Sequence, residues 1–416
     1  MYTKNDLAVN GGNKARTKPE TPMFPGGMAI GIEEEQAVLE VLRSRRLFRY
    51  YGPYDTESKV EAFENAYAKQ AGSKYCLALN SCSNALTAAL IAVGVQPGDE
   101  VIVPGYTFVA SAAAIVAANA IPVICEIDDT LTMDPNDIER NITSKTKVIM
   151  PVHMRGASCQ MDEIMAVAKR HGLKVVEDAA QSNGGSYKGK KIGTIGDAGC
   201  FSLQYHKIIT CGEGGVIVTD DKNVYVRAMS FHDTGANWRD ADIRHEDVPF
   251  PGMNMRMTEL QGALALVQLG RREKLINTMR GHKRRIKEAM SRYGITFRRM
   301  ADESGELALT IVFFLPDKEK AAEIVKALHA EGIVAGSQRL PDWHVYTSWD
   351  HILNRRGNND SGFPFTLSDR TYDKNMCPKT LDYLFKGVHI AINPAWTDAD
   401  VSEIITGIEK VFSVML

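Results

Sequence analysis

A lysine lies between two β-rich runs in the stretch CFSLQYHKIITCGEGGVIVTD, residues 200–220. Lys207 follows Ser202 by five positions and precedes a glycine cluster at residues 212–215. An unprotonated lysine amine forms Schiff bases with aldehydes, and glycines let the backbone approach a ligand closely. A solvated surface lysine is the ordinary alternative. The apolar flanks of this turn favour a reactive lysine near the end of a buried strand.

A carboxylate closes another apolar run, in the stretch VVEDAAQSNGG. Asp178 ends the run, and Gln181 follows three residues later. A buried carboxylate is costly unless it meets a cation or strong hydrogen-bond donors, and a protonated ring nitrogen would be a suitable partner. The alternative is that Asp178 only caps the following turn.

A third polar group stands between a strand pattern and a helix pattern, in the stretch LALNSCSNALTAAL. The unpaired N–H groups at a helix N-terminus suit a phosphate. The hydroxyls of Ser81 and Ser83 would add further donors. The alternative interpretation is that Ser83 only caps the helix.

Together these groups describe one ligand. A phosphate cup, an acid for a ring nitrogen and an aldehyde-trapping lysine predict pyridoxal 5'-phosphate (PLP), for which the lysine and the acidic partner are the protein groups that matter. Phe108, in the stretch PGYTFVAS directly after a strand pattern, is placed to stack on the ring. An ordinary position in the core is its alternative.

Alternating elements must position these groups. Strands are predicted for five near-continuous apolar runs, at residues 75–79, 100–104, 121–127, 147–152 and 174–178. Helix patterns lie between them. The alternation predicts an α/β fold with a parallel sheet covered on both faces. Such sheets bind ligands at the carboxyl ends of their strands.

The chain is predicted to have three parts. Residues 1–30 are polar and rich in glycine and proline, and form an arm without an assigned role. Residues 31–275 form a large PLP-binding domain with the mostly parallel sheet, and residues 276–416 form a smaller C-terminal α/β domain. Capping boxes are predicted at Thr258 with Gln261 and at Thr397 with Asp400.

Two amphipathic helices are predicted before the first strand. The first carries Ile32, Leu39 and Leu42 at helical spacing, and the second stops at Gly72. Such apolar stripes ordinarily pack on a core.

The composition is that of an ordinary globular protein. Of its 416 residues 44% are hydrophobic, and the formal net charge is -2. This charge gives no bulk electrostatic case for nucleic acid or membrane partners. Seven scattered cysteines without a CxxC pair predict a reduced, cytoplasmic protein without a metal site. The sequence has no apolar run of membrane-spanning length, and its start lacks the apolar core of a signal peptide.

Six motifs in this order resemble the DegT/DnrJ/EryC1/StrS aminotransferases, a family of PLP-dependent enzymes of fold type I. The resemblance covers about residues 28–413 and rests on YYGPYDTESKVEAFENAYA, NSCSNAL, GDEVIVPGYTFVAS, VVEDAAQSNGG, FSLQYHKIITCGEGGVIVTDD and GMNMRMTELQGALALVQL. It implies that glutamate or glutamine donates an amino group to a keto- or aldehyde sugar or cyclitol by ping-pong transamination. The finer match is to the branch that contains 8-amino-3,8-dideoxy-octulosonate aminotransferase and 3-amino-5-hydroxybenzoate synthase.

The resemblance also implies the roles of single residues around the cofactor ring. Lys207 would hold PLP through a Schiff base and act as the catalytic residue. Asp178 would pair with the pyridine nitrogen, and Gln181 would contact the ring 3'-oxygen. Phe108 would stack on the ring.

The implied phosphate site comes from several segments. Ser83, Ser202 and the backbone near Cys82 would bind the phosphate, and Asn254 would reach the cofactor phosphate of a neighbouring subunit. The resemblance thus implies a homodimer with shared active sites. The family's turn usually reads Ser-Gly-Thr, so Cys82 places a Cβ near the phosphate, whereas Ser83 keeps the hydroxyl.

Two positions differ from what the resemblance leads us to expect, and the residues of one loop have no assigned role. Many members have histidine where this chain has Asn183. Arg155 is not expected at its position, where it would either bind an anionic substrate group bidentately or be an ordinary surface arginine. The stretch RLPDWHVYTSWDHI offers His344, Tyr346 and Trp349 for contacts with a sugar.

Three alternative functions are set against this one. A PLP-dependent sugar dehydratase of the same fold has histidine in place of the Schiff-base lysine, so Lys207 disfavours it. A nicotinamide-dependent oxidoreductase is disfavoured because no GxGxxG follows the first strand. A catalytically silent regulatory scaffold is disfavoured by the intact set of Lys207, Asp178 and Ser202.

Overall fold

A seven-stranded sheet forms the centre of the computed structural model, which describes residues 2–50, 58–236, 250–357 and 359–416. Part of the first family motif, residues 51–57, lies outside these ranges. The strand order is β1-β9-β8-β5-β4-β2-β3. The strands are β1 Tyr75–Leu79, β2 Glu100–Pro104, β3 Ile121–Cys125, β4 Thr146–Ile149, β5 Lys174–Asp178, β8 Ala198–Ser202 and β9 Gly215–Thr219.

The sheet is mostly parallel, as the alternation predicted, with β9 as the exception. The neighbours from β8 through β5, β4 and β2 to β3 pair in parallel, whereas β9 pairs antiparallel with both β1 and β8. The chain returns from β8 through the loop at residues 203–214 without an intervening helix, so β9 runs back along the edge of β8. This loop carries Lys207.

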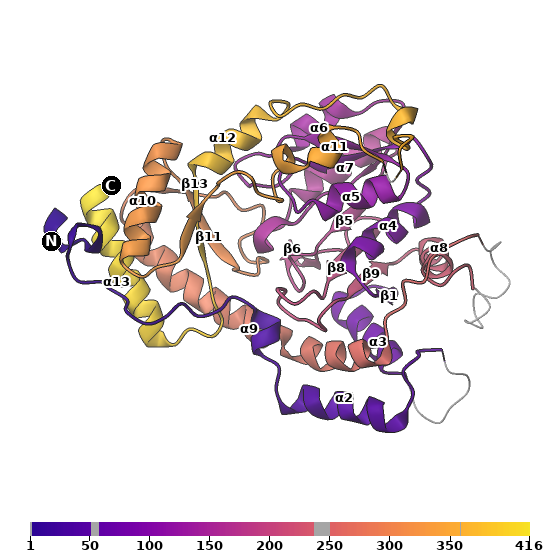
Figure 1. The fold of residues 1–416 in the computed structure, drawn as a ribbon, viewed down its shortest axis with the longest axis horizontal. Helices are drawn as coiled ribbons and strands as arrows, with labels where there is room; N and C mark the ends of the chain where they lie inside the picture. Colours follow the sequence, from indigo (N-terminus) through magenta and orange to yellow (C-terminus); the bar gives the residue numbers. More distant parts are fainter. Residues whose placement is uncertain (1, 51–57, 237–249, 358) are drawn as a thin grey trace.

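Helices cover both faces of the sheet (Figure 1). In β2, Val101 and Val103 pack in one apolar cluster with α4, α5 and α8, while Ile102 packs in another with α6 and α7. The helices of this part are α1 Pro25–Met28, α2 Ile32–Ser44, α3 Lys59–Ala71, α4 Cys82–Ala92, α5 Ala110–Ala117, α6 Pro135–Asn141, α7 Met161–His171, α8 Lys222–His232 and α9 Glu259–Ser291.

A second sheet follows in the chain, with strand order β10-β11-β13-β12 and antiparallel pairing. Its strands are β10 Thr296–Phe297, β11 Thr310–Phe314, β12 Ala335–Ser337 and β13 Gly387–Ala391, and the helices of this region are α10 Lys318–Ala330, α11 Asp350–Leu353, α12 Pro378–Lys386 and α13 Asp398–Met415. A small hairpin, β6 Ser186–Tyr187 with β7 Lys190–Lys191, completes the strands described. Both predicted capping boxes are present. The predicted division near residue 275 falls inside α9 and stays a prediction.

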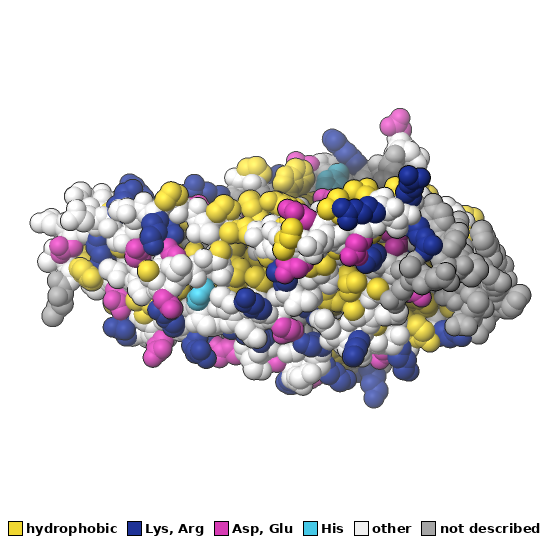
Figure 2. Space-filling view, turned by 90° about the horizontal axis from the view of Figure 1, so that it is seen from below, with side chains coloured by type: hydrophobic (Ala, Val, Ile, Leu, Met, Phe, Trp, Pro, Cys, Tyr) yellow, Lys and Arg dark blue, Asp and Glu magenta, His cyan; other side chains and the backbone are white. Residues whose placement is uncertain are grey.

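The outer surface of α2 exposes apolar side chains among charged ones. Ile32, Leu39 and Leu42 are exposed, while Glu34 is buried and accepts hydrogen bonds from Gln268 and Arg271 at 2.9 and 2.8 Å. The helix lies along the lower edge of Figure 1, and the view from below shows hydrophobic side chains gathered on that face (Figure 2). The amphipathic pattern was thus correct, but its apolar side does not pack on the core of this chain.

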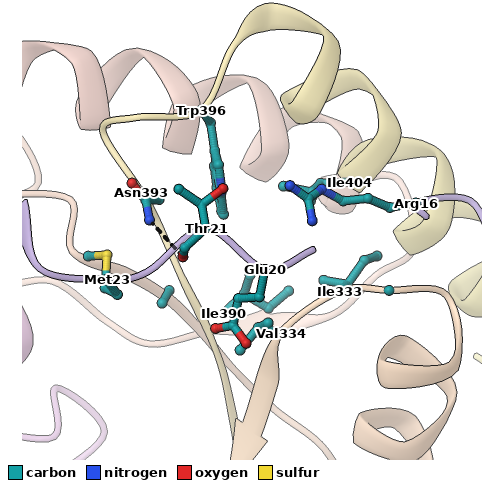
Figure 3. Close-up of a pocket in the computed structure, with 12 residues that line it drawn as sticks. Arg16, Glu20, Thr21, Met23, Ile333, Val334, Ile390, Asn393, Trp396 and Ile404 are labelled. Carbon is teal, nitrogen blue, oxygen red and sulfur yellow. Dashed lines mark hydrogen bonds between the residues drawn. The ribbon is translucent and has the colours of Figure 1, made fainter. Parts of the chain in front are cut away.

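The N-terminal arm lies along the smaller sheet and its helices before it reaches the large domain (Figure 1). Glu331, buried at the end of α10, accepts hydrogen bonds from the backbone of Ala8 and Ala15 at 2.8 and 2.9 Å. Asn393 donates to the carbonyls of Thr21 and Pro22 at 3.1 and 2.9 Å, beside a shallow pocket (Figure 3).

Across the described ranges, no helix combines the length and apolarity needed to cross a membrane.

Candidate active site

A cavity of about 240 Å³ adjoins the carboxyl edge of the large sheet. The loops after β4, β5 and β8 contribute Arg155, Gln181 and Lys207 to its walls. Met23 of the arm and Thr310 of β11 close other sides. The cavity therefore lies where parallel sheets place their ligand sites, and segments from most of the chain meet there.

Lys207 is half-buried in the β8–β9 loop. Its backbone carbonyl accepts a hydrogen bond from the Gly26 N–H at 3.1 Å, and its own N–H donates to the Gln204 carbonyl at 2.9 Å. The ring of Phe24 packs on that of His206, with centroids 4.8 Å apart. The end of the arm thus supports the backbone of the predicted catalytic lysine.

Asp178 ends β5 and is 4% exposed. One carboxylate oxygen accepts a hydrogen bond from the Ser111 hydroxyl at 2.7 Å, and the other accepts from the Ala180 N–H at 3.1 Å. Burial raises the pKa of Asp178, while the Ser111 hydrogen bond and the positive charge of Lys207 oppose this rise. Asp178 therefore caps its turn and also presents a buried carboxylate near Lys207, while its pairing with a ring nitrogen stays a prediction.

The start of α4 meets the ends of two strands. Ser81 is the N-cap, since its Oγ accepts from the Asn84 N–H at 3.2 Å. Ser83 is exposed one position into the helix, so the capping alternative for Ser83 is wrong. Gly215 pairs with Ser202 across β8 and β9, and a Cβ on Gly215 would lie 2.3 Å from the Ser81 carbonyl oxygen. Only a residue without a side chain permits this approach.

Cys82, in the first turn of α4, interacts electrostatically with Asp178 and with Lys207. Burial raises the pKa of its thiol, the carboxylate of Asp178 raises it further, and Lys207 opposes both effects. The three groups therefore lie within electrostatic reach of one another, as the predicted cofactor site requires.

The remaining predicted residues are distributed around this centre. Phe108 is 46% exposed, and its ring centroid lies 5.3 Å from that of His344, so the core alternative for Phe108 is wrong. Gln181 lines the cavity, and its side-chain oxygen accepts from the Arg155 N–H at 3.1 Å. Asn254 is exposed and does not line the cavity. The next residue, Met255, accepts a hydrogen bond from the Asn80 N–H at 2.8 Å, close to the start of α4.

Several contributors were not predicted. Ser111 lies at the end of the PGYTFVAS motif, where a hydroxyl in the first turn after a strand was an available signal. Asn183 has a side-chain oxygen that accepts from Tyr67 and Arg272 at 2.9 and 2.7 Å. Its amide nitrogen, although buried, has no hydrogen-bond partner among the described residues. The arm carried no local signal for a role at the site.

The structure separates the three candidate residues of the loop RLPDWHVYTSWDHI. Tyr346 and Trp349 are fully buried, and only His344 of the three lines the cavity. Its Nδ1 donates to the Asp342 carboxylate at 3.0 Å, which fixes the ring.

The residues present fit PLP. Lys207 supplies an amine for the aldehyde, Asp178 a buried carboxylate for the ring nitrogen, and Gly215 the close backbone approach that a phosphate cup needs. Phe108 offers an exposed aromatic face, and the Asn183 amide nitrogen, which has no partner among the described residues, is a free donor there beside the cavity. This combination defines a site for a phosphorylated aldehyde cofactor.

Comparison with known proteins agrees with this site. Residues 29–351 match the model of the DegT/DnrJ/EryC1/StrS aminotransferase family. The spore coat polysaccharide biosynthesis protein SpsC of Bacillus subtilis is 33% identical over 400 residues, 92% of this chain and 95% of that protein. L-glutamine:2-deoxy-scyllo-inosose aminotransferase of Streptomyces fradiae is 38% identical over 297 residues, 70% of this chain and 69% of that protein.

The fold agrees as well. The crystal structure of 3-amino-5-hydroxybenzoic acid synthase superposes with a TM-score of 0.79 at 25% identity, covering 95% of this chain and 100% of that one. It is one of the two enzymes that marked the finer branch in the sequence. The chain belongs to the DegT/DnrJ/EryC1/StrS aminotransferase family, and its cofactor is PLP.

Proposed function

We propose that this enzyme moves an amino group from glutamate or glutamine to a keto- or aldehyde sugar or cyclitol in two successive half-reactions. The placement of Lys207 beside buried Asp178, at one edge of the large sheet, carries the proposal. PLP, when bound, accepts the electron density that develops as the donor loses its Cα proton. The sugar or cyclitol acceptor is the class named in relatives such as the inosose aminotransferase.

Lys207 is proposed to hold the cofactor covalently and then to act as a base. After release, its Nζ removes the proton from the donor Cα, and in the second half-reaction it returns a proton to the acceptor carbon. Asp178 keeps the ring nitrogen protonated, and Gln181 orients the ring through its 3'-oxygen. Phe108 stacks on the ring and excludes water from one face.

Phosphate binding is proposed for Ser83, Ser202 and the backbone at Cys82. The support is local: Gly215 brings the end of β8 and the start of α4 together. The unpaired N–H groups of the first turn of α4 then face an anion.

A homodimer is also proposed, with Asn254 reaching the cofactor phosphate of the second subunit. The exposed apolar side of α2, with Ile32 59% and Leu42 50% exposed, supports an interface there. Met253, beside Asn254, is 60% exposed. Seven unpaired cysteines favour a cytoplasmic location.

The test combines spectroscopy with one substitution. The purified protein should absorb as a lysine-bound PLP enzyme, lose that absorbance with borohydride, and yield a modified peptide that contains Lys207. Lys207→Ala should abolish turnover, a loss beyond the roughly 100- to 10,000-fold that a positioned proton-transfer group contributes.

The matched control is Lys190→Ala, which removes an exposed lysine in β7 and should leave turnover unchanged. Near-normal turnover in Lys207→Ala, or cofactor fixed on another lysine, would contradict the proposal. Products that have lost water without gaining nitrogen would show a dehydratase instead.

A further inference from the structure

Arg155 lines the same cavity in a strained conformation. It follows β4 with φ 53°, in the left-handed region, which costs a non-glycine residue free energy and recurs at functional sites. Its Nε donates to the Tyr106 hydroxyl at 2.5 Å. Within the described ranges, no carboxylate forms an ion pair with its guanidinium. The surface-arginine alternative is therefore wrong, because the charge faces a cavity.

The walls of this cavity are cationic. Arg155 and Lys207 line it together with two histidines, and no aspartate or glutamate is among the described lining residues. The nearby carboxylates are already engaged. Asp342 accepts a hydrogen bond from His344 at 3.0 Å, and Asp178 is buried beneath two donors. Once Lys207 is engaged by the cofactor, an anionic ligand would meet the positive charge of Arg155 and no carboxylate among the described lining residues.

The position of Arg155 indicates which anionic group of a substrate lies within its reach. Its backbone N–H donates to Gln181, the residue proposed for the 3'-oxygen of the ring, and it shares about 240 Å³ with Lys207. The amine-bearing carbon of the donor must come within reach of Lys207 Nζ. The α-carboxylate is bonded to that same carbon, so a cation in this small cavity is near it.

We propose that Arg155 binds the α-carboxylate of the amino donor and so selects α-amino acids for the first half-reaction. This inference rests on the proposed function and adds its donor subsite. The guanidinium presents paired N–H groups that match a carboxylate, and Tyr106 holds Nε so that the two terminal nitrogens stay available. The buried Thr310 hydroxyl, without a hydrogen-bond partner among the described residues, lines the same cavity as a further donor.

The test follows the first half-reaction of the holoenzyme by its absorbance in single turnovers. Donors are L-glutamate, L-glutamine and their counterparts without the α-carboxylate, 4-aminobutyrate and 4-aminobutanamide. In the wild type, removal of the α-carboxylate should raise the saturation constant about 10- to 100-fold, the range of charge-assisted hydrogen bonds. Arg155→Gln should raise the constant for the α-amino acids by a similar factor and leave the decarboxylated donors nearly unaffected.

Arg155→Lys should recover part of the affinity, because it keeps the charge but loses the bidentate geometry. Arg284→Gln, an exposed arginine on α9, is the matched control and should match the wild type. Cofactor absorbance and the melting temperature of each variant show whether it is folded and loaded. Equal losses for both donor classes would indicate a merely structural role and overturn the inference.

The acceptor is the second possible source of an anion. If Arg155→Gln slows only the second half-reaction, the subsite belongs to the acceptor and the inference is wrong. If the wild type transfers no amino group from any donor, the proposed function fails and the inference fails with it. Wild-type transfer together with unchanged donor affinity in Arg155→Gln overturns the inference alone.

Discussion

The two sides of the active-site cavity are built in different ways. The cofactor side, proposed for Asp178, Ser202 and Lys207, comes from the strand ends and adjoining loops of one sheet, and of these three Lys207 lines the cavity. The opposite side combines Met23 of the arm with Thr310 and Ala391 of the second sheet. The first side is formed by neighbouring strands of one sheet, whereas the second requires three separate segments to meet. Changes to the second sheet can therefore alter the substrate-side walls, whereas changes to the arm also reach the lysine loop, because Gly26 donates a hydrogen bond to the Lys207 carbonyl.

The two sides also differ in the partners of their charged side chains. On the cofactor side, the Asp178 carboxylate receives two hydrogen bonds. On the substrate side, Arg155 has no carboxylate partner within the described ranges. Substitutions on the cofactor side should therefore abolish chemistry, and those on the substrate side should change affinity or stability.

After the loss of turnover in Lys207→Ala, the largest effect is expected for Asp178→Asn. The amide can still accept from Ala180 and donate to Ser111, but it cannot hold a protonated ring nitrogen as a charged partner. Turnover should fall on the order of 100-fold or more, as when a preorganised electrostatic contact is removed. Steady-state kinetics of the loaded variant measure this loss, and a drop of less than tenfold would remove Asp178 from its proposed role.

The same substitution should stabilise the cofactor-free protein. Because burial raises the pKa of Asp178 in the folded state, the folded protein favours the protonated form, and stability falls as the pH rises through that pKa. Asp178→Asn should therefore increase the free energy of unfolding at pH 7, with a gain that shrinks as the pH falls through the raised pKa toward the ordinary value of an aspartate. Denaturant unfolding of cofactor-free samples across this range checks the sign, and a loss of stability at pH 7 would contradict it.

A smaller effect is expected for Gly215→Ala. The added Cβ would lie 2.3 Å from the Ser81 carbonyl oxygen and 2.6 Å from the Cys82 nitrogen, so the start of α4 must move. Such overpacking costs about 1–3 kcal/mol, which corresponds to a roughly 5- to 150-fold weaker cofactor affinity if the strain falls on the phosphate cup. Gly281→Ala is the control, because a Cβ there meets nothing within 4 Å. Cofactor titration that gives equal affinities for both variants would rule out a cup at this position.

The smallest effect on activity is expected for Glu331→Gln, which acts on the substrate side through the arm. The substitution leaves Lys410, an ion pair partner at 2.8 Å, without its buried carboxylate. Breaking a buried pair costs about 3–5 kcal/mol, and the arm should become open to trypsin near Lys14 and Lys18. Turnover should fall only a few-fold, because Lys207 keeps its other loop contacts.

Glu323→Gln is the control for this arm variant. Glu323 lies on the same helix, where its carboxylate pairs with Lys320 and is 56% exposed, so the cost should stay below about 1 kcal/mol. Thermal unfolding and timed proteolysis measure both variants. If they are cleaved at the same rate, Glu331 does not hold the arm.

The success of prediction from the sequence also differs between the cofactor side and the substrate side. Lys207, Asp178 and the start of α4 could be proposed because each stands at a junction between a strand and a loop, where local spacing is informative. The arm contacts, by contrast, join Gly26 to Lys207 and Glu331 to Ala8. Such pairings depend on tertiary structure, and no periodicity encodes them.

Local signals also failed in instructive ways. The apolar stripe of α2 was correctly recognised, but spacing cannot tell a core from an interface, and Ile32 is 59% exposed. Ser83 rather than Ser81 was considered as the cap. Both residues are serines, which favour that position, so the residue type does not distinguish them. The antiparallel direction of β9 was not predicted, since only the length of the β8–β9 loop distinguishes a return from a crossover.

The docking of the arm has a consequence for how the protein is made. Residues 2–24 leave the ribosome well before Glu331, Asn393 and Lys410, which hold them. Domains form in order during translation, so the large sheet can be complete while the arm still lacks its binding surface. The support that the arm gives to the lysine loop would then be added only after these later residues have emerged, and nascent chains would hold cofactor groups before they hold a finished substrate cavity.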